Sequence, residues 1–210
     1  MPLHPFDSWP SDRRLVVATH NPGKLREARA ALAVYPIPLV SAGELGLPVP
    51  DETGTTFVEN ALLKAHAAAE ASGLPALADD SGLCVPLLDG RPGVHSADWE
   101  GPERSPATAM RRLEQELNGF RFNPAPEAFF VCVLALVDPT SEDAVITVEG
   151  RCDGTLTWPP RGSGGHGYDP MFVPAGSAFS FGEMTAEAKA AVGHRGAAFR
   201  ALIAALGKSA

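Results

Sequence analysis

The segment from Leu15 to Lys24 constrains the fold more than any other part of the chain. An apolar, β-branched run, Leu15–Val17, leads at once into a helix start. Asn21 is a favourable N-cap residue, and Pro22 suits the first helical position because its missing N–H would be unpaired there anyway. A strand that runs into a helix presents unpaired N–H groups and the positive end of a helix dipole, beside the charge of Lys24. The segment therefore favours a phosphate, although most strand–helix units in α/β proteins bind none.

A second polar feature follows the apolar run Leu74–Ala78. It consists of two adjacent carboxylates, Asp79 and Asp80, followed by Ser81 and Gly82. Because side chains alternate along a strand, we expect one carboxylate, at the end of this strand, to face a ligand while the other caps or braces the turn that follows. Carboxylate oxygens are ligands that Mg²⁺ prefers, and Glu52, in the loop before the next helix, is a plausible second ligand. A plain turn is the alternative interpretation of these four residues.

The helix expected over Phe57–Ala71 begins with a capping box formed by Thr56 and Glu59. It carries Lys64 on the same face as Asn60, one turn away. Lys64 is either a solvated surface residue or points at the same anion as Lys24.

A loop rich in glycine, Gly162–Pro170, precedes the C-terminal helical segment. Its glycines let the backbone approach a flat ligand closely, Tyr168 could stack on a base, and Asp169 could accept from the ring N–H groups of that base. A flexible surface loop is the alternative. Three cationic or donor groups then surround a helix break at Gly193 and suit an anion or a carbonyl: Lys189, His194 and Arg195.

The remaining pattern predicts a mixed α/β fold. The strands expected over Phe129–Val137 and Val145–Thr157 form a hairpin, and a further helix begins at Ser105-Pro106 and ends at Asn118-Gly119. Helices mixed with a hairpin and long strands favour a mixed sheet rather than a purely parallel one. We expect a loosely ordered leader over residues 1–14 and a single domain over residues 15–210.

Composition excludes several classes of function. The net charge of −8 argues against a broad nucleic-acid-binding face, and the apolar runs are too short to span a membrane. The three cysteines, Cys84, Cys132 and Cys152, form no CxxC pair and no zinc pattern. We therefore expect a protein of the cytoplasm, with neither nucleic acid nor membrane as a partner.

Several motifs together resemble one family, that of inosine triphosphate pyrophosphatase. In chain order they are Thr19-x-Asn21-x-x-Lys24, Glu52-Thr53-Gly54-x-Thr56-Phe57-x-Glu59-Asn60-Ala61-x-x-Lys64-Ala65, Ala78-Asp79-Asp80-Ser81-Gly82-Leu83, Pro92-Gly93-Val94-x-Ser96-Ala97, Gly165-x-Gly167-Tyr168-Asp169-Pro170, Glu187-x-Lys189 and His194-Arg195-Gly196. The resemblance spans Leu15 to Leu206. It implies an elongated fold with a curved mixed sheet, flanking helices and two lobes that form a nucleotide cleft, and a homodimer. It also implies Mg²⁺-dependent hydrolysis of dITP, ITP and XTP to the monophosphate and pyrophosphate, which keeps deaminated purines out of DNA and RNA.

The same resemblance implies roles for individual residues. Asp80 is implied as the catalytic acid/base, and Glu52 and Asp80 as the metal ligands. The implied substrate-binding residues are Thr19, His20, Asn21, Pro22, Gly23, Lys24, Lys64, Ser81, His166, Gly167, Tyr168, Asp169, Lys189, His194 and Arg195. Of these, Lys189, His194 and Arg195 are implied to read the 6-oxo side of the base.

The chain departs from the family pattern at three positions. His20 replaces a usual glycine, His166 a frequent phenylalanine and Gly193 a usual serine. All three adjoin residues expected to bind substrate, so they bear on the choice of base more than on the reaction. Two alternatives differ in function: a purine nucleotide-binding module without catalysis, and a pyrophosphatase for modified pyrimidine triphosphates. The paired Glu52 and Asp80 argue against the first, and the Gly-Tyr-Asp and His-Arg elements argue against the second.

Overall fold

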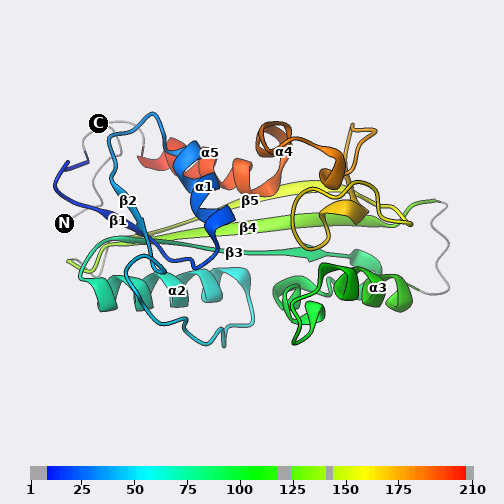
Figure 1. The fold of residues 1–210 in the computed structure, drawn as a ribbon, viewed down its shortest axis with the longest axis horizontal. Helices are drawn as coiled ribbons and strands as arrows, with labels where there is room; N and C mark the ends of the chain where they lie inside the picture. The colour runs from blue at the N-terminus through cyan, green and yellow to red at the C-terminus, as the bar shows by residue number, and fades with distance from the viewer. Residues whose placement is uncertain (1–8, 118–123, 141–143, 207–210) are drawn as a thin grey trace. The chain divides into compact units, whose positions relative to one another are not determined.

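The computed structural model describes residues 9–117, 124–140 and 144–206 (Figure 1). Within them it contains six strands and five α-helices, together with short 3-10 turns. The strands are β1 (Leu15–Val17), β2 (Leu39–Ser41), β3 (Ala76–Cys84), β4 (Glu127–Val137), β5 (Val145–Leu156) and β6 (Phe172–Pro174). The helices are α1 (Pro22–Ala31), α2 (Phe57–Ser72), α3 (Pro106–Glu116), α4 (Ala186–Val192) and α5 (His194–Leu206).

The strands form a sheet in the order β2-β1-β3-β4-β5-β6. β1 pairs in parallel with both β2 and β3, with Val16 opposite Val40 and Ala76, whereas β5 pairs antiparallel with β6. The mixed sheet expected from the sequence is thereby confirmed. The expected elongation, curvature and two-lobe cleft stay predictions.

The chain divides into two compact units, with the boundary inside β3. Unit 1 holds the described residues of Met1–Asp80, Val133–Glu149 and Ala198–Ala210, and unit 2 those of Ser81–Cys132 and Gly150–Ala197. The consecutive residues Asp80 and Ser81 therefore belong to different units.

Unit 1 is built around the strand–helix start that opens the chain. The Asn21 side chain caps α1 by accepting from the Gly23 N–H, with Pro22 at the first helical position, as predicted. α2 begins with the predicted capping box and ends at Gly73, whose φ of 67° lies in the left-handed region that glycine tolerates best. α1 and α2 lie on opposite sides of the strands (Figure 1).

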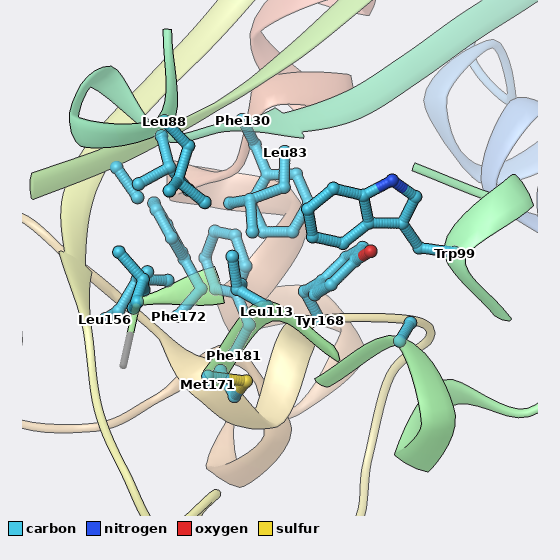
Figure 2. Close-up of a cluster of buried hydrophobic side chains, with 14 of the residues drawn as sticks. Leu83, Leu88, Trp99, Leu113, Phe130, Leu156, Tyr168, Met171, Phe172 and Phe181 are labelled. Carbon is cyan, nitrogen blue, oxygen red and sulfur yellow. The ribbon is translucent and has the colours of Figure 1, made fainter. Parts of the chain in front are cut away.

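Unit 2 contains a cluster of buried apolar and aromatic side chains (Figure 2). Leu83, Trp99, Leu113, Phe130 and Phe172 are among its members. α3 contributes Ala109 and Leu113, and both are fully buried at 0% exposure. This packing makes unit 2 a rigid support for the loop that carries Tyr168 and Asp169.

The expected turn at Asp79–Gly82 is wrong. β3 runs without a break from Ala76 to Cys84, so these residues continue the strand. Aspartate and glycine are poor strand formers, but β3 lies between β1 and β4 in the sheet, and this tertiary setting overrides that preference.

The expected leader is tied down over the part that the structure describes. Trp9 is buried and donates its indole N–H to the carbonyl of Arg13, whose guanidinium pairs with Asp138 at 2.7 Å. The expected end of the third helix at Asn118-Gly119 lies outside the described residues.

Candidate active site

The helix-start segment, Thr19–Lys24, has its polar groups arranged by its own hydrogen bonds. The Thr19 hydroxyl accepts from the Asn21 N–H at 3.1 Å, and the Asn21 side chain accepts from the Gly23 N–H at 2.7 Å. Thr19 is buried, whereas Asn21 and Pro22 are exposed. The segment therefore presents a preorganised helix N-terminus to solvent.

His20 links this segment to the turn that follows β2. Its ring Nε2 lies 2.8 Å from the Leu47 carbonyl oxygen, and the Gly43 N–H donates to the Thr19 carbonyl at 3.3 Å. Because a carbonyl only accepts, Nε2 carries the proton in this contact. The imidazole thus takes part in holding the segment as well as lying on its surface.

Two lysines meet three carboxylates beside this segment, forming a lysine–carboxylate cluster. Lys24 pairs with Asp79 at 2.9 Å, while Lys64 pairs with Asp80 at 2.7 Å and with Glu52 at 3.3 Å. Adjacent strand residues point to opposite faces, so the two aspartates of β3 engage lysines from α1 and α2 separately. The sequence interpretation had one aspartate cap or brace a turn, whereas Asp79 lies within a continuous strand and pairs with Lys24 instead.

The lysine–carboxylate cluster shifts the pKa values of Lys64 and Asp80. Burial of Lys64 opposes its charge, but the attraction of Asp80, Asp79 and Glu52 is stronger and raises its pKa. Burial raises the pKa of Asp80 from 3.8 to about 6, with repulsion from Glu52 adding to the effect and attraction to Lys64 opposing it. A carboxyl that titrates near neutrality suits proton transfer better than an ordinary aspartate does.

The loop that carries Glu52 is held to α2 by a buried amide. Asn60 is 3% exposed, and its side-chain oxygen accepts from the Gly54 N–H at 2.8 Å. Glu59 accepts in addition from the N–H groups of Thr55 and Thr56 at 2.7 and 3.0 Å. The capping box visible in the sequence thus also fixes the loop before it.

Two carboxylates of the lysine–carboxylate cluster, those of Glu52 and Asp80, suit a hard divalent cation. Asp80 Oδ2 is buried and accepts no hydrogen bond from the described residues, and the carboxylate of Glu52 reaches the same lysine as Asp80. Two convergent carboxylates suit Mg²⁺, which keeps several waters and seldom needs a full protein cage. The described residues hold no group of three or more histidine, cysteine, aspartate or glutamate side chains placed for a metal.

In unit 2, Asp169 is the centre of a second polar group. It is 2% exposed and accepts from the backbone N–H of His166 at 2.6 Å and from Lys189 Nζ at 2.5 Å. Gly165 has a φ of 78°, and a Cβ at this position would overlap the Asp169 carboxylate. Glycine is required there both for the backbone and for the close approach. His166 itself is exposed, and Gly167 is half-buried beside it.

Tyr168 does not offer the stacking surface expected from the sequence. Its ring is 2% exposed within the buried cluster of unit 2 (Figure 2), and its hydroxyl donates to the Ser96 carbonyl at 3.3 Å. Burial raises the pKa of Tyr168, so the hydroxyl keeps the proton that it donates. With its ring inside the core, Tyr168 anchors the loop rather than facing a ligand.

The two residues after the helix break are placed differently. His194 is 4% exposed and begins α5, whereas Arg195 is half-buried and its Nη2 lies 3.4 Å from the Ser81 hydroxyl. The predicted interruption at Gly193, between α4 and α5, is confirmed. The structure thus brings Ser81 and Arg195 together in unit 2.

Sequence reasoning missed the residues that support these groups. Ser96 accepts from the Leu83 N–H at 2.9 Å and donates to the Gly93 carbonyl at 2.6 Å, besides holding Tyr168 through its own carbonyl. Phe130 and Phe181 pack against His194. Such contacts depend on tertiary packing, and local periodicity does not reveal them.

The described residues contain no helix that is both long and apolar enough to cross a membrane. All three cysteines are free and buried.

The fold and its polar groups define an α/β protein with a capped helix N-terminus next to a lysine–carboxylate cluster. The chain belongs to the Ham1 family, whose model matches residues 15–205. It is 54% identical to a dITP/XTP pyrophosphatase of Gluconobacter oxydans over 90% of this chain and 89% of that protein. It is also 54% identical to a dITP/XTP pyrophosphatase of Caulobacter vibrioides, over 92% of this chain and 97% of the relative.

Solved structures agree with this assignment. A HAM1 protein from Coxiella burnetii superposes with a TM-score of 0.86 at 35% identity, covering 94% of this chain and 100% of that one. A nucleoside-triphosphatase / dITP/XTP pyrophosphatase from Mycobacterium abscessus superposes with a TM-score of 0.72 at 39% identity, covering 93% and 100%.

Proposed function

We propose that this protein hydrolyses non-canonical purine nucleoside triphosphates, namely dITP, ITP and XTP, to the monophosphate and pyrophosphate. Its relatives at 54% identity are named dITP/XTP pyrophosphatases, and the match covers nearly their whole length. Such an activity removes deaminated purines from the nucleotide pool before they enter DNA or RNA. The lysine–carboxylate cluster next to the helix-start segment is the observation that carries the proposal.

The helix-start segment is proposed to bind the triphosphate. Thr19, Asn21 and Lys24 supply a hydroxyl, an amide and a charge at the helix N-terminus, with His20, Pro22 and Gly23 forming the backbone between them. Lys64 is proposed to lie beside the same phosphates. Both lysines are already placed by ion pairs, which limits the entropy lost when an anion binds.

Charge balance supports a requirement for Mg²⁺ held by Glu52 and Asp80. The cluster contains two lysines and three carboxylates, so its formal charge is −1 before a triphosphate arrives. Repulsion of a polyanion from such a site is severe at short distance. Held by Glu52 and Asp80, Mg²⁺ would supply positive charge to a triphosphate and to the pyrophosphate that leaves.

Asp80 is proposed as the general base. Its carboxylate is buried, and its raised pKa of about 6 leaves it ionised at neutral pH yet more basic than an ordinary aspartate. It accepts a proton from the water that attacks the α-phosphorus. Lys64, 2.7 Å from Asp80, orients this carboxylate and stabilises its ionised form.

The polar groups of unit 2 are proposed to contact the base. Lys189, His194 and Arg195 are suited to donate to a 6-oxo group, which adenine lacks, while Asp169 positions Lys189. Ser81, His166 and Gly167 contribute polar or backbone surface, and Tyr168 holds the loop from inside the core. Sites built on such hydrogen bonds reject the wrong base because buried donors are left unpaired.

We further propose that the enzyme works as a homodimer in the cytoplasm, with a nucleotide as its substrate and neither nucleic acid nor membrane as a partner. The net charge of −8 argues against a broad nucleic-acid-binding face.

A substrate panel tests the proposal. Pyrophosphate release is measured with dITP, ITP, XTP, dATP and dGTP, with Mg²⁺ or EDTA, for the native protein and the variants Asp80→Asn and Asp138→Asn. We expect turnover of the first three with Mg²⁺, a loss of about 10³-fold in Asp80→Asn, and native activity in Asp138→Asn, which makes the same charge change at a different site. Tight ITP binding without any product would favour the non-catalytic module instead.

A further inference from the structure

His194 rests on a face of aromatic rings. Its imidazole lies parallel to the ring of Phe130, with 4.6 Å between centroids and 13° between planes. Phe181 lies 6.3 Å away at 35°. The residue is 4% exposed, so these rings form a large part of its surroundings.

Phe130 is itself held firmly. It comes from β4 and packs edge-on against Phe172 at 4.9 Å and stacked against Phe181 at 6.0 Å, all inside the buried cluster of unit 2 (Figure 2). A ring fixed by a strand and by two further aromatic side chains has little freedom to tilt. It therefore offers His194 a plane of fixed orientation.

The same aromatic group reaches a second residue proposed to contact the base. Lys189 Nζ lies 5.3 Å from the centre of the Phe181 ring, within the range of a cation–π contact. At the helix break, a Cβ on Gly193 would lie 3.6 Å from the ring of Phe181 and 2.6 Å from the Lys189 carbonyl oxygen. Gly193, Lys189 and His194 thus all lie next to the rings of Phe130 or Phe181.

We propose that Phe130 is a positioning residue for base selection, acting by setting the plane of the His194 imidazole. A hydrogen bond to a base edge depends on the direction of the donor, so an imidazole free to tilt would discriminate less between bases. This inference rests on the proposed function, because it assigns Phe130 a part in choosing the base.

The test compares two variants of neighbouring core residues. Phe130→Leu removes the ring under His194, whereas Phe172→Leu removes a similar volume from the same cluster but leaves both rings of the Phe130–His194 pair in place. In that variant Phe130 is still held by β4 and by its stacking on Phe181. Both variants are expected to lose stability. Only Phe130→Leu is expected to lower the ratio of kcat/KM for dITP to that for dATP, by about three- to tenfold, as the loss of one aromatic pair implies. Phe130→Tyr keeps the ring and should restore most of the ratio.

A spectroscopic measurement checks the stacking of His194 on Phe130 without relying on activity. In the native protein, stacking on Phe130 should shift the ring protons of His194 upfield; the shift should vanish in Phe130→Leu and persist in Phe172→Leu. Equal dITP-to-dATP ratios in the two folded leucine variants would overturn the inference. If the native protein did not hydrolyse dITP, the proposed function would fail and the inference with it, whatever the spectrum showed.

Discussion

Replacing the buried carboxylate of Asp80 should stabilise the metal-free protein while it removes the proposed base. Burial holds the pKa of Asp80 at about 6 in the folded chain, against 3.8 ordinarily. The folded state therefore binds this proton more tightly than the unfolded state does. Keeping the carboxylate charged above pH 6 costs folding free energy, and Asp80→Asn avoids this cost.

The size of the effect follows from the shift. The difference of about two pKa units corresponds to about 3 kcal/mol at roughly 1.4 kcal/mol per unit. Because the native pKa is the higher one, the native protein loses stability through this group as the pH rises from about 4 to about 6, and the loss is constant above. The attraction of Lys64 is already contained in the shifted pKa, so an uncharged amide has nearly the electrostatic effect of protonation.

Urea denaturation in EDTA measures this. We expect Asp80→Asn to exceed the native free energy of unfolding by about 1.5 kcal/mol at pH 5 and about 3 kcal/mol at pH 8. Asp138→Asn is a control of opposite sign: burial opposes its charge, but hydrogen bonds from Thr140 and Arg13 prevail and lower the pKa of Asp138. That variant should lose stability at pH 8. The reasoning is refuted if Asp80→Asn is less stable than the native protein at pH 8, or if its gain does not change with pH.

Two other predictions concern the metal and the glycine loop. At pH 6, metal-free Asp80 is about half protonated, so Mg²⁺ binding should release about half a proton, and at pH 8 almost none. Calorimetry in buffers of different ionisation enthalpy measures this release. No release at pH 6 would contradict the assignment of Asp80 as a ligand. Gly165→Ala should destabilise the protein by about 2–4 kcal/mol in urea denaturation, because Gly165 has a φ of 78° and an added Cβ would overlap Asp169. Gly176→Ala is the control: Gly176 has a φ of 79° but open space around it, so this variant should lose only about 1 kcal/mol. Equal losses in the two glycine variants would show that the contact with Asp169 is unimportant.

The parts of the site that could be predicted are those whose chemistry is local. The Asn21 cap and the Thr56–Glu59 capping box each depend on residues three or fewer positions apart, and both occur as expected. Polar residues at such positions have few other uses, which makes their pattern informative. The helix starts that place Lys24 and Lys64 were therefore visible in the sequence.

The predictions that failed concern residues whose placement depends on tertiary contacts. Tyr168 follows Gly165 and Gly167 and precedes Asp169, which is the local pattern of an exposed loop residue. Its ring is nevertheless only 2% exposed, because it packs within the buried cluster of unit 2. The support of His194 by Phe130 joins residues 64 positions apart in sequence. In the sequence, Phe130 is one of several apolar residues of a strand, and nothing local separates it from its neighbours.

Asp79 and Asp80 show how an error in secondary structure left the chemistry correct. The pair was expected at a turn, but alternation along a continuous strand separates the two carboxylates just as the functional interpretation required. One pairs with Lys24 from the first helix and the other with Lys64 from the second, and those helices lie on opposite sides of the strands (Figure 1). In a turn both carboxylates would be exposed, and burial would not raise the pKa of either. Because the strand buries Asp80, it is the strand rather than the dipeptide that gives this aspartate the pKa of a base.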